Sequence, residues 1–191
     1  HEPSIVINCF RTLIEEAETN PSKAIFYNSY LPHFLKDECD KFNSKLIHLS
    51  TDCVFSGNKG DYLELDNKDG TNYYSQTKSI GEIVNQRDLT IRTSYIGPNI
   101  SNQSEELFHW FMMENKDVNG YVNAYWSGVT TLELVKNIEK CIELKLTGLY
   151  HLTQNEKISK YELLLLIKKI WNKKNLIIKK NIDVQIDRSL I

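Results

Sequence analysis

Apolar and polar positions along the first half of the chain follow an alternation of short and long segments. Three short apolar runs rich in β-branched residues are typical of strands buried on both faces. They are Ser4 to Phe10, Lys45 to Ser50 and Leu89 to Ile96. Helical apolar spacing fills the intervals, from Ser22 to Phe42 with Pro32 as a kink, and from about Tyr74 to Asn85. This alternation predicts a parallel α/β sheet, in which ligands bind at the carboxyl ends of the strands.

The second half is more helical and predicts a smaller α+β lobe. Helices are expected from Ser104 to Asn115, Leu132 to Leu144 and Tyr161 to Asn172, and short strands from Leu149 to Leu152 and Leu176 to Lys179. The last two helices open with capping boxes, Thr130-x-x-Glu133 and Ser159-x-x-Glu162. The change of pattern after Pro98 places a boundary between residues 1–98 and 99–191, with some elements of the second part returning to the sheet.

Composition narrows the class of protein. The 191 residues are 41% hydrophobic and carry a formal charge of −2, with acidic and basic residues interspersed. This distribution argues against nucleic-acid partners and against membrane anchoring, and it favours a cytoplasmic protein. The four cysteines are far apart, which favours reduced thiols. The dispersed residues His48, His109 and His151 predict no metal site.

Two groups of residues at predicted strand ends carry candidate chemistry. Ser50-Thr51-Asp52 follows the second strand, and Tyr74-x-x-x-Lys78 opens the next helix with both side chains on one face. A nearby ammonium stabilises a phenolate, so such a pair suits proton transfer, while the Thr51 hydroxyl can hold a carbonyl oxygen. On spacing alone, a solvated first helical turn accounts for the pair equally well.

Three longer segments add a resemblance to a known family. KLIHLSTDCVFSGNKGDYLELD, YYSQTKSIGE and LTIRTSYIGP resemble the core of the extended short-chain dehydrogenase/reductase family, in particular its dTDP-4-dehydrorhamnose reductase branch. The resemblance implies a Rossmann-like fold, in which residues 1–98 form the C-terminal half of a dinucleotide-binding domain and residues 99–191 form mainly a substrate-binding lobe. It also implies a catalytic triad of Thr51, Tyr74 and Lys78, with Tyr74 and Lys78 also contacting the cofactor. The remaining cofactor-binding residues that it implies are Asn8, Cys9, Asn28, Thr93, Ser94, Tyr95 and Ile96.

The same comparison bears on the substrate. Thr51, Asp52 and Cys53 are expected to contact it. Related sugar-nucleotide 4,6-dehydratases have a sequence similar to Thr-Asp-Glu at this position, because elimination of water needs a carboxyl acid and a carboxylate base. The third residue here is Cys53, which disfavours dehydratase chemistry. In the segment GYVNAYWSGVTTLEL, the side chains of Tyr121, Asn123 and Trp126 suit contacts with a nucleotide or sugar ring. A packing layer rich in tyrosine and tryptophan accounts for them equally well.

The sequence lacks the glycine-rich turn with which this family binds pyrophosphate, since none of its eight glycines forms one. Its first strand resembles the fourth strand of the family, so the earlier strands of the fold are absent and we expect the chain to be a portion of a longer protein. The expected activity is reduction of the 4-keto group of a nucleotide-linked 4-keto-6-deoxysugar in surface polysaccharide synthesis, with NADPH favoured over NADH. A sugar-nucleotide epimerase and a non-catalytic regulatory subunit are the alternatives, and a homodimer is possible.

Overall fold

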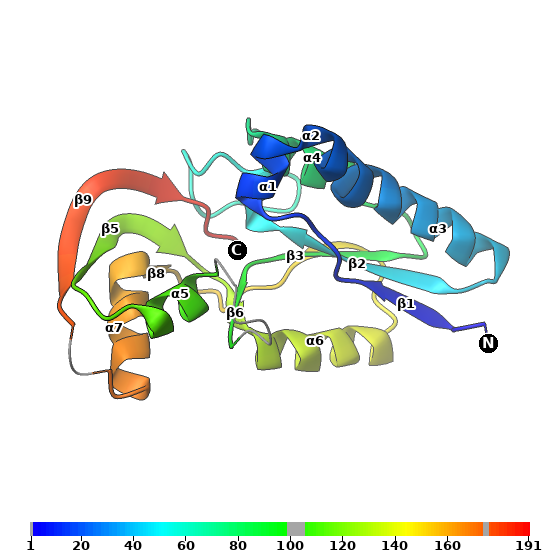
Figure 1. Cartoon of the computed structure of the whole chain (residues 1–191). Coiled ribbons are helices and arrows are strands. Elements are labelled where there is room, and N and C mark those ends of the chain that lie inside the picture. The colour runs from blue at the N-terminus through cyan, green and yellow to red at the C-terminus, as the bar shows by residue number, and fades with distance from the viewer. Residues whose placement is uncertain (1, 99–105, 174–175) are drawn as a thin grey trace.

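A four-stranded, all-parallel sheet in the order β1-β2-β3-β7 forms the centre of the molecule. The computed structural model describes residues 2–98, 106–173 and 176–191. Figure 1 shows the helices α1 to α4 on one face of this sheet and α6 on the other. In chain order these elements are β1 (Ile5–Asn8), α1 (Ile14–Thr19), α2 (Pro21–Ala24), the π-helix η1 (Ile25–Tyr30), α3 (Leu31–Lys41), β2 (Lys45–Thr51), the 3-10 turn η2 (Asp52–Val54), α4 (Tyr73–Ile80), β3 (Leu89–Thr93), α6 (Thr131–Glu143) and β7 (Gly148–His151).

Strand register aligns the carboxyl ends that matter for function. Thr51 at the end of β2 lies opposite Thr93 at the end of β3, and Asn8 at the end of β1 lies opposite His48. The apolar strand residues between these ends pack on α6. They form one core cluster: Ile47, Leu49, Leu89, Ile91, Val129, Leu134 and Ile138. The expected parallel α/β sheet is confirmed.

The helical layer above the sheet differs from the sequence-based expectation. A separate helix, α1, precedes Pro21 and was not predicted. The helix that contains Pro32 is irregular directly before that residue. Its backbone stays helical from η1 into α3, and the wider π-helical turn of η1 carries Asn28 and Ser29 into the interior.

Helix α4 ends earlier than expected because it packs closely on η1. It opens with Asn72, whose side chain accepts a hydrogen bond from the Ser75 amide at 2.8 Å, and its last residue is Ile80. A Cβ atom on the following Gly81 would come within 1.9 Å of the Asn28 carbonyl oxygen. This close approach fixes α4 against η1 and thereby places the side chains in its first two turns.

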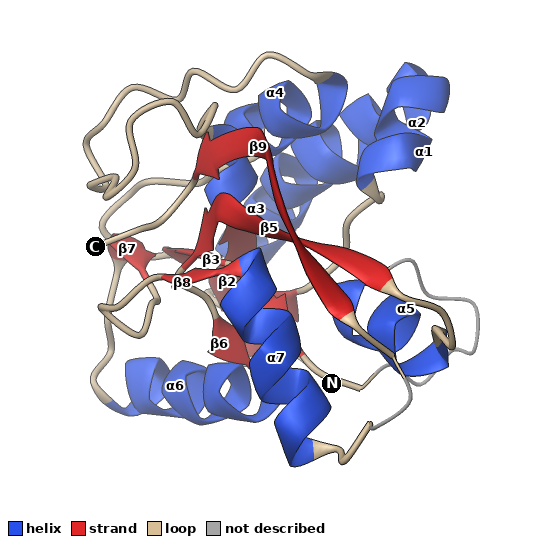
Figure 2. Cartoon of the chain, turned by 90° about the vertical axis from the view of Figure 1, so that its left-hand side faces the viewer, coloured by secondary structure: helices blue, strands red, loops and turns tan. Residues whose placement is uncertain are grey.

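The rest of the chain forms a smaller lobe at one end of the sheet. A three-stranded sheet, β8-β5-β9, packs against α7, as Figure 2 shows. The elements are β4 (Tyr95–Ile96), α5 (Leu107–Met113), β5 (Val118–Trp126), β6 (Val129–Thr130), β8 (Ile158–Ser159), α7 (Lys160–Ile170) and β9 (Ile178–Asp187). The expected capping box is present at Ser159, where the Glu162 side chain and backbone both participate. The mixed lobe beside a parallel sheet agrees with the predicted architecture.

Two strands of this lobe were misjudged from the sequence. Strand β5 was not predicted, because its asparagines and glycine obscure the alternation of buried and exposed positions. Strand β9 reaches Asp187 rather than ending at Lys179. All of its residues after Ile178 are exposed or half-buried, so no continuous apolar run marks it in the sequence. The predicted helix from Ser104 is observed only from Leu107, and residues 104 and 105 lie outside the described part of the chain.

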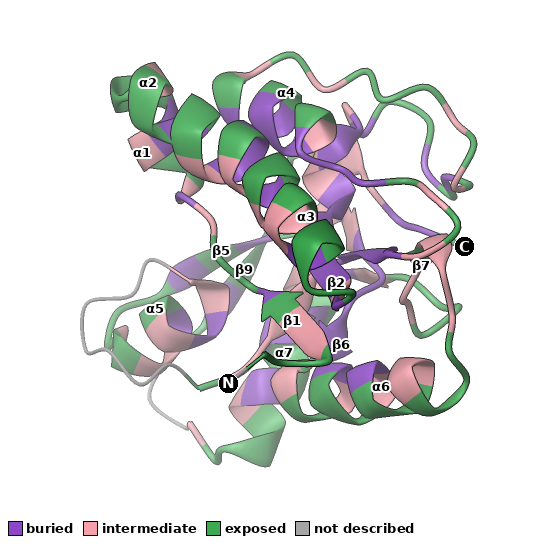
Figure 3. Ribbon diagram, turned by 90° about the vertical axis from the view of Figure 1, so that its right-hand side faces the viewer, coloured by how far each residue is buried: buried purple, intermediate pink, exposed green. Residues whose placement is uncertain are grey.

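Burial follows this layered arrangement. Figure 3 shows β2 largely buried and exposed surface on the outer sides of α2, α3 and α6. Within residues 2–98, 106–173 and 176–191, no helix has the length and apolarity needed to cross a membrane. All four cysteines are free, and Cys39 is the buried one.

Candidate active site

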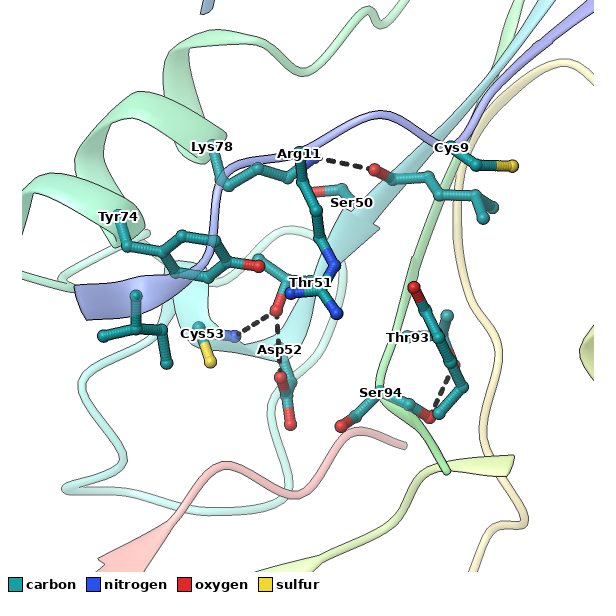
Figure 4. A pocket seen from close by; sticks show the side chains of 13 residues that line it. Cys9, Arg11, Ser50, Thr51, Asp52, Cys53, Tyr74, Lys78, Thr93 and Ser94 are labelled. Carbon is teal, nitrogen blue, oxygen red and sulfur yellow. Dashed lines mark hydrogen bonds between the residues drawn. The ribbon is translucent and has the colours of Figure 1, made fainter. Parts of the chain in front are cut away.

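A cavity of about 150 Å³ opens where β1, β2 and β3 end. It collects side chains from both sequence motifs and from the start of the lobe, and Figure 4 shows Arg11, Thr51 and Tyr74 directed toward one another. Its lining consists of Cys9, Arg11, Ile14, Leu49, Ser50, Thr51, Asp52, Cys53, Tyr74, Lys78, Thr93, Ser94 and Tyr95. Residues widely separated in the sequence are therefore brought together at the edge of the sheet where an α/β protein binds ligands.

Thr51 is the last residue of β2, and its hydroxyl is fixed by the turn that follows. Its Oγ1 donates to Asp52 Oδ1 at 3.1 Å and accepts from the Cys53 amide at 3.1 Å. Burial raises the pKa of Asp52, while the positive charges of Lys160 and Arg188 from the lobe lower it. Burial also raises the pKa of Cys53, to about 12, so this thiol stays protonated near neutral pH.

Tyr74 lies in the first turn of α4 and is 4% exposed. Its ring packs between Ala17 and Ala24, with Cys53 beside it. Burial raises the pKa of the Tyr74 phenol, and the nearby Arg11 guanidinium and a hydrogen bond with Thr51 act in the opposite direction. The phenol is thus a proton donor that needs positive charge or hydrogen bonding to ionise.

Lys78 lies one turn further along α4 and is 1% exposed. Its Nζ donates to the Leu49 carbonyl oxygen at 2.8 Å and lies 3.5 Å from His48 Nε2. Burial lowers the pKa of Lys78 to about 8, and the positive charge of Arg11 contributes to this. Within the described residues this ammonium forms no ion pair with a carboxylate, although the charge of Glu82 acts on it from a longer distance and partly opposes the fall in its pKa.

We expect Lys78→Met to raise the free energy of unfolding at pH 7. The folded-state pKa of about 8 is below the ordinary 10.5, so the unfolded chain binds the proton more tightly and the charged lysine destabilises the native state. That penalty is fully present below pH 8 and disappears as the pH rises from about 8 to 10.5. The advantage of the variant in urea denaturation should therefore shrink over that interval. A stability difference between Lys78→Met and the wild type that does not change with pH, or that favours the wild type, would contradict a penalty from the buried charge of Lys78.

Three residues expected at the cofactor lie outside the cavity. The Asn8 side chain hydrogen-bonds His48 Nδ1 at 3.1 Å and the Phe10 amide at 3.0 Å. Asn28 is fully buried behind α4, where Nδ2 donates to the hydroxyls of Thr12 and Thr77. Ile96 packs against the core of the lobe. Their polar groups and apolar surface are already used within the fold, whereas Cys9, Thr93, Ser94 and Tyr95 do line the cavity.

The expected substrate residues of the lobe are also separate from the cavity. Tyr121 lines a different depression, together with Trp110 and Lys160. Asn123 lies on β5 opposite Gln185. Trp126 is nearest, because its Nε1 donates to the Ser94 hydroxyl at 2.8 Å, yet its ring packs in the core of the lobe. A substrate contact for these three residues stays a prediction.

Arg11 is the charged cavity residue that sequence reasoning missed. It lies on the connection from β1 to α1, and its Nη2 donates to Glu106 Oε1 at 2.6 Å. Its guanidinium lies 5.8 Å from the centre of the Tyr95 ring. The available signal was an arginine three residues beyond a strand end, a position that faces the ligand-binding edge of a parallel sheet.

Comparison with known proteins agrees with this arrangement. A family model described as the RmlD substrate binding domain matches residues 1–183. The chain belongs to the RmlD family. A dTDP-4-dehydrorhamnose reductase of Aggregatibacter actinomycetemcomitans is 29% identical to it over 175 residues, which are 84% of this chain and 59% of that protein. The resemblance inferred from the sequence motifs is thereby confirmed.

Solved structures of RmlD relatives share the fold. A hypothetical dTDP-4-dehydrorhamnose reductase from Sulfolobus tokodaii superposes with a TM-score of 0.85 and 28% identity, over 98% of this chain and 71% of that one. A dTDP-4-dehydrorhamnose reductase from Bacillus anthracis, solved in complex with NADP, has a TM-score of 0.80 and 23% identity, over 96% of this chain and 66% of that one. The chain spans about six-tenths of the length of the curated Aggregatibacter relative.

Proposed function

We propose that the protein carrying this chain reduces the 4-keto group of a nucleoside-diphosphate 4-keto-6-deoxysugar, with NADPH or NADH as the reductant. The observation that carries the proposal is the convergence of Thr51, Tyr74 and Lys78 on one cavity in a chain of the RmlD family. This convergence favours catalysis over a solvated helical turn, because Tyr74 and Lys78 are 4% and 1% exposed.

Each member of the triad has a distinct part in the proposed reaction. The Thr51 hydroxyl turns its proton from Asp52 to the carbonyl oxygen and holds that oxygen beside the Tyr74 phenol. Tyr74 donates its proton to that oxygen as the keto group becomes an alcohol. Lys78 keeps positive charge on this helix face and supplies a donor for the hydroxyls of a ribose. Thr51, Asp52 and Cys53 together form the wall against which the sugar lies.

The cavity fits the nicotinamide end of a dinucleotide, which supplies the hydride when bound. Cys9, Thr93, Ser94 and Tyr95 surround the space next to Tyr74 and Lys78. Within the described residues, by contrast, no glycine lies on the connection between β1 and α1, so these residues offer no cradle for the pyrophosphate. We assign the cofactor contacts of this chain to the nicotinamide and its ribose.

Cys53 supports reduction over dehydration. A 4,6-dehydratase needs a carboxylate base near this position, and a thiol with a pKa of about 12 is not a base near neutral pH. Epimerisation uses the same three groups as reduction and differs in its stoichiometry. It returns the hydride to the sugar, whereas reduction consumes one reduced nicotinamide for each product formed.

The test is to incubate the intact protein with a dTDP-linked 4-keto-6-deoxysugar and NADPH, and to compare nucleotide oxidation with product formation. One NADPH oxidised per deoxysugar formed supports the reductase. An epimerised product without net NADPH consumption would replace it with an epimerase. Tight dinucleotide binding without turnover of dTDP- and UDP-linked substrates would point to a regulatory subunit instead.

A further inference from the structure

The cation that acts most directly on the Tyr74 phenol belongs to neither sequence motif. Arg11 enters the cavity from the β1–α1 connection, and Figure 4 shows its side chain extending toward Thr51 and the hydroxyl end of Tyr74. Lys78, the cation that the motif predicts, directs its Nζ to the Leu49 carbonyl oxygen at 2.8 Å. Two positive charges therefore serve this cavity, and they have different immediate partners.

Arg11 is held in position from both sides. Its Nη2 donates to Glu106, at the start of α5, at 2.6 Å, and its guanidinium lies against the Tyr95 ring. The side chain is 26% exposed, so water screens it only in part. An arginine fixed by contacts 84 and 95 residues away along the chain is part of a built site rather than a mobile surface residue.

We propose that Arg11 is a positioning residue of the proposed reduction, whose guanidinium stabilises negative charge on the Tyr74 oxygen during proton transfer. This inference rests on the proposed function. Reduced nicotinamide would supply the hydride to the carbonyl carbon. The Tyr74 O–H bond breaks as its proton passes to the former carbonyl oxygen, and a phenolate remains until a proton from water restores the phenol. Arg11 acts while that negative charge develops.

Arg11 is the charged group that favours ionisation of Tyr74. Asp52 and Cys53 of η2 oppose ionisation of the phenol, and Thr51 favours it through a hydrogen bond. Helices α1 and α2 face the ring with alanines, and Glu18 of α1 accepts the amide of Tyr73 at the helix terminus. His48 of β2 lies beyond Lys78, where burial lowers its pKa well below 6.5 and keeps it neutral.

Steady-state kinetics of the intact protein over a range of pH test the proposal. Arg11→Met should lower kcat by about 10-fold, the equivalent of about one unit in the acidity of Tyr74. The basic limb of the kcat profile, where Tyr74 loses its proton, should also move to higher pH. Arg11→Lys should restore most of kcat and the position of that limb. Arg87→Met, which removes an arginine paired with Asp40 outside the cavity, should leave both unchanged.

A rise in KM with unchanged kcat would overturn the proposal in favour of substrate binding by Arg11. Equal impairment of Arg11→Lys and Arg11→Met would also overturn it, since charge alone would then not suffice.

A second measurement does not depend on turnover. Fluorotyrosine incorporated into the protein has a lower intrinsic phenol pKa, and its fluorine NMR signal reports ionisation, with Tyr74→Phe assigning the resonance. The Tyr74 resonance should titrate at higher pH in Arg11→Met than in the wild type. An identical titration in both would overturn the proposal even if the wild type proved active. A shifted titration in an inactive wild type would uphold the action of Arg11 on Tyr74 and reject the proposed function separately.

Discussion

Replacing Tyr74 with phenylalanine should lower kcat for reduction by about 10²- to 10⁴-fold, the usual contribution of a positioned proton donor. Phenylalanine keeps the ring that packs between Ala17 and Ala24 and removes only the hydroxyl. The Thr51 hydroxyl stays satisfied by Asp52 and the Cys53 amide, so the free energy of unfolding should change by no more than about 1 kcal/mol. Rates of NADPH oxidation and urea denaturation of the same preparations measure both quantities.

The adjacent Tyr73 supplies a matched control. It lies on the same turn of α4 but is 47% exposed and does not line the cavity. Tyr73→Phe should therefore keep wild-type turnover. Wild-type turnover in Tyr74→Phe would show that Tyr74 has no part in the reaction. An equal loss of turnover in Tyr74→Phe and Tyr73→Phe would indicate that the helix, and not the phenol, had been disturbed.

The two central strands of the sheet, β2 and β3, were predictable from the sequence because they are buried on both faces. Every residue of β3 is buried, and all of β2 except Lys45 is buried, so both strands carry apolar and β-branched residues without exposed positions between them. Strands β5 and β9 are half-exposed, and their polar positions carry asparagine, lysine and aspartate that disguise the alternation. Strands with one solvated face are defined by the partner that covers the other face, which a single sequence does not display.

The candidate site was predictable where one short motif on one element fixed it. Thr51 ends a strand, while Tyr74 and Lys78 share a helix face, and both relations follow from sequence spacing. Arg11 and Glu106 meet across 95 residues, so their contact depends on how the lobe packs on the sheet. Asn28 was expected at the cofactor but does not line the cavity. It lies in a π-helical turn and contacts Thr12 and Thr77, which helical spacing alone could not indicate.

A buried ion pair behind the cavity should dominate the stability of this part of the fold. Arg92 on β3 donates two hydrogen bonds to the Glu82 carboxylate, from Nε at 2.7 Å and from Nη2 at 2.8 Å. The Arg92 and Glu82 side chains are 3% and 1% exposed. The Ser50 hydroxyl donates to the same carboxylate at 2.6 Å, and Lys68 pairs with it at 3.1 Å. This carboxylate therefore links the ends of β2 and β3 to the segment that follows α4.

Arg92→Met should lower the free energy of unfolding by about 3–5 kcal/mol, because it leaves the Glu82 carboxylate buried with only Lys68 opposite it. Lys41→Met, which breaks an exposed pair with Glu38, should leave the free energy of unfolding nearly unchanged. Combining Glu82→Gln with Arg92→Met should cost less than the sum of the single changes, since neither then strands a charge. Additive losses in urea denaturation would contradict this coupling.

The pH dependence of the same pair follows from its charges. Burial raises the pKa of Glu82, but the hydrogen bonds and charge of Arg92, with Ser50 and Lys68, outweigh it and hold the pKa below its ordinary 4.5. The stabilisation is therefore fully present above pH 4.5 and is lost as the pH falls through the lower folded-state value. Wild type and Arg92→Met should converge in stability on acidification. Because Ser50 precedes Thr51, the same acidification should loosen the strand end that holds the substrate carbonyl in the proposed reaction.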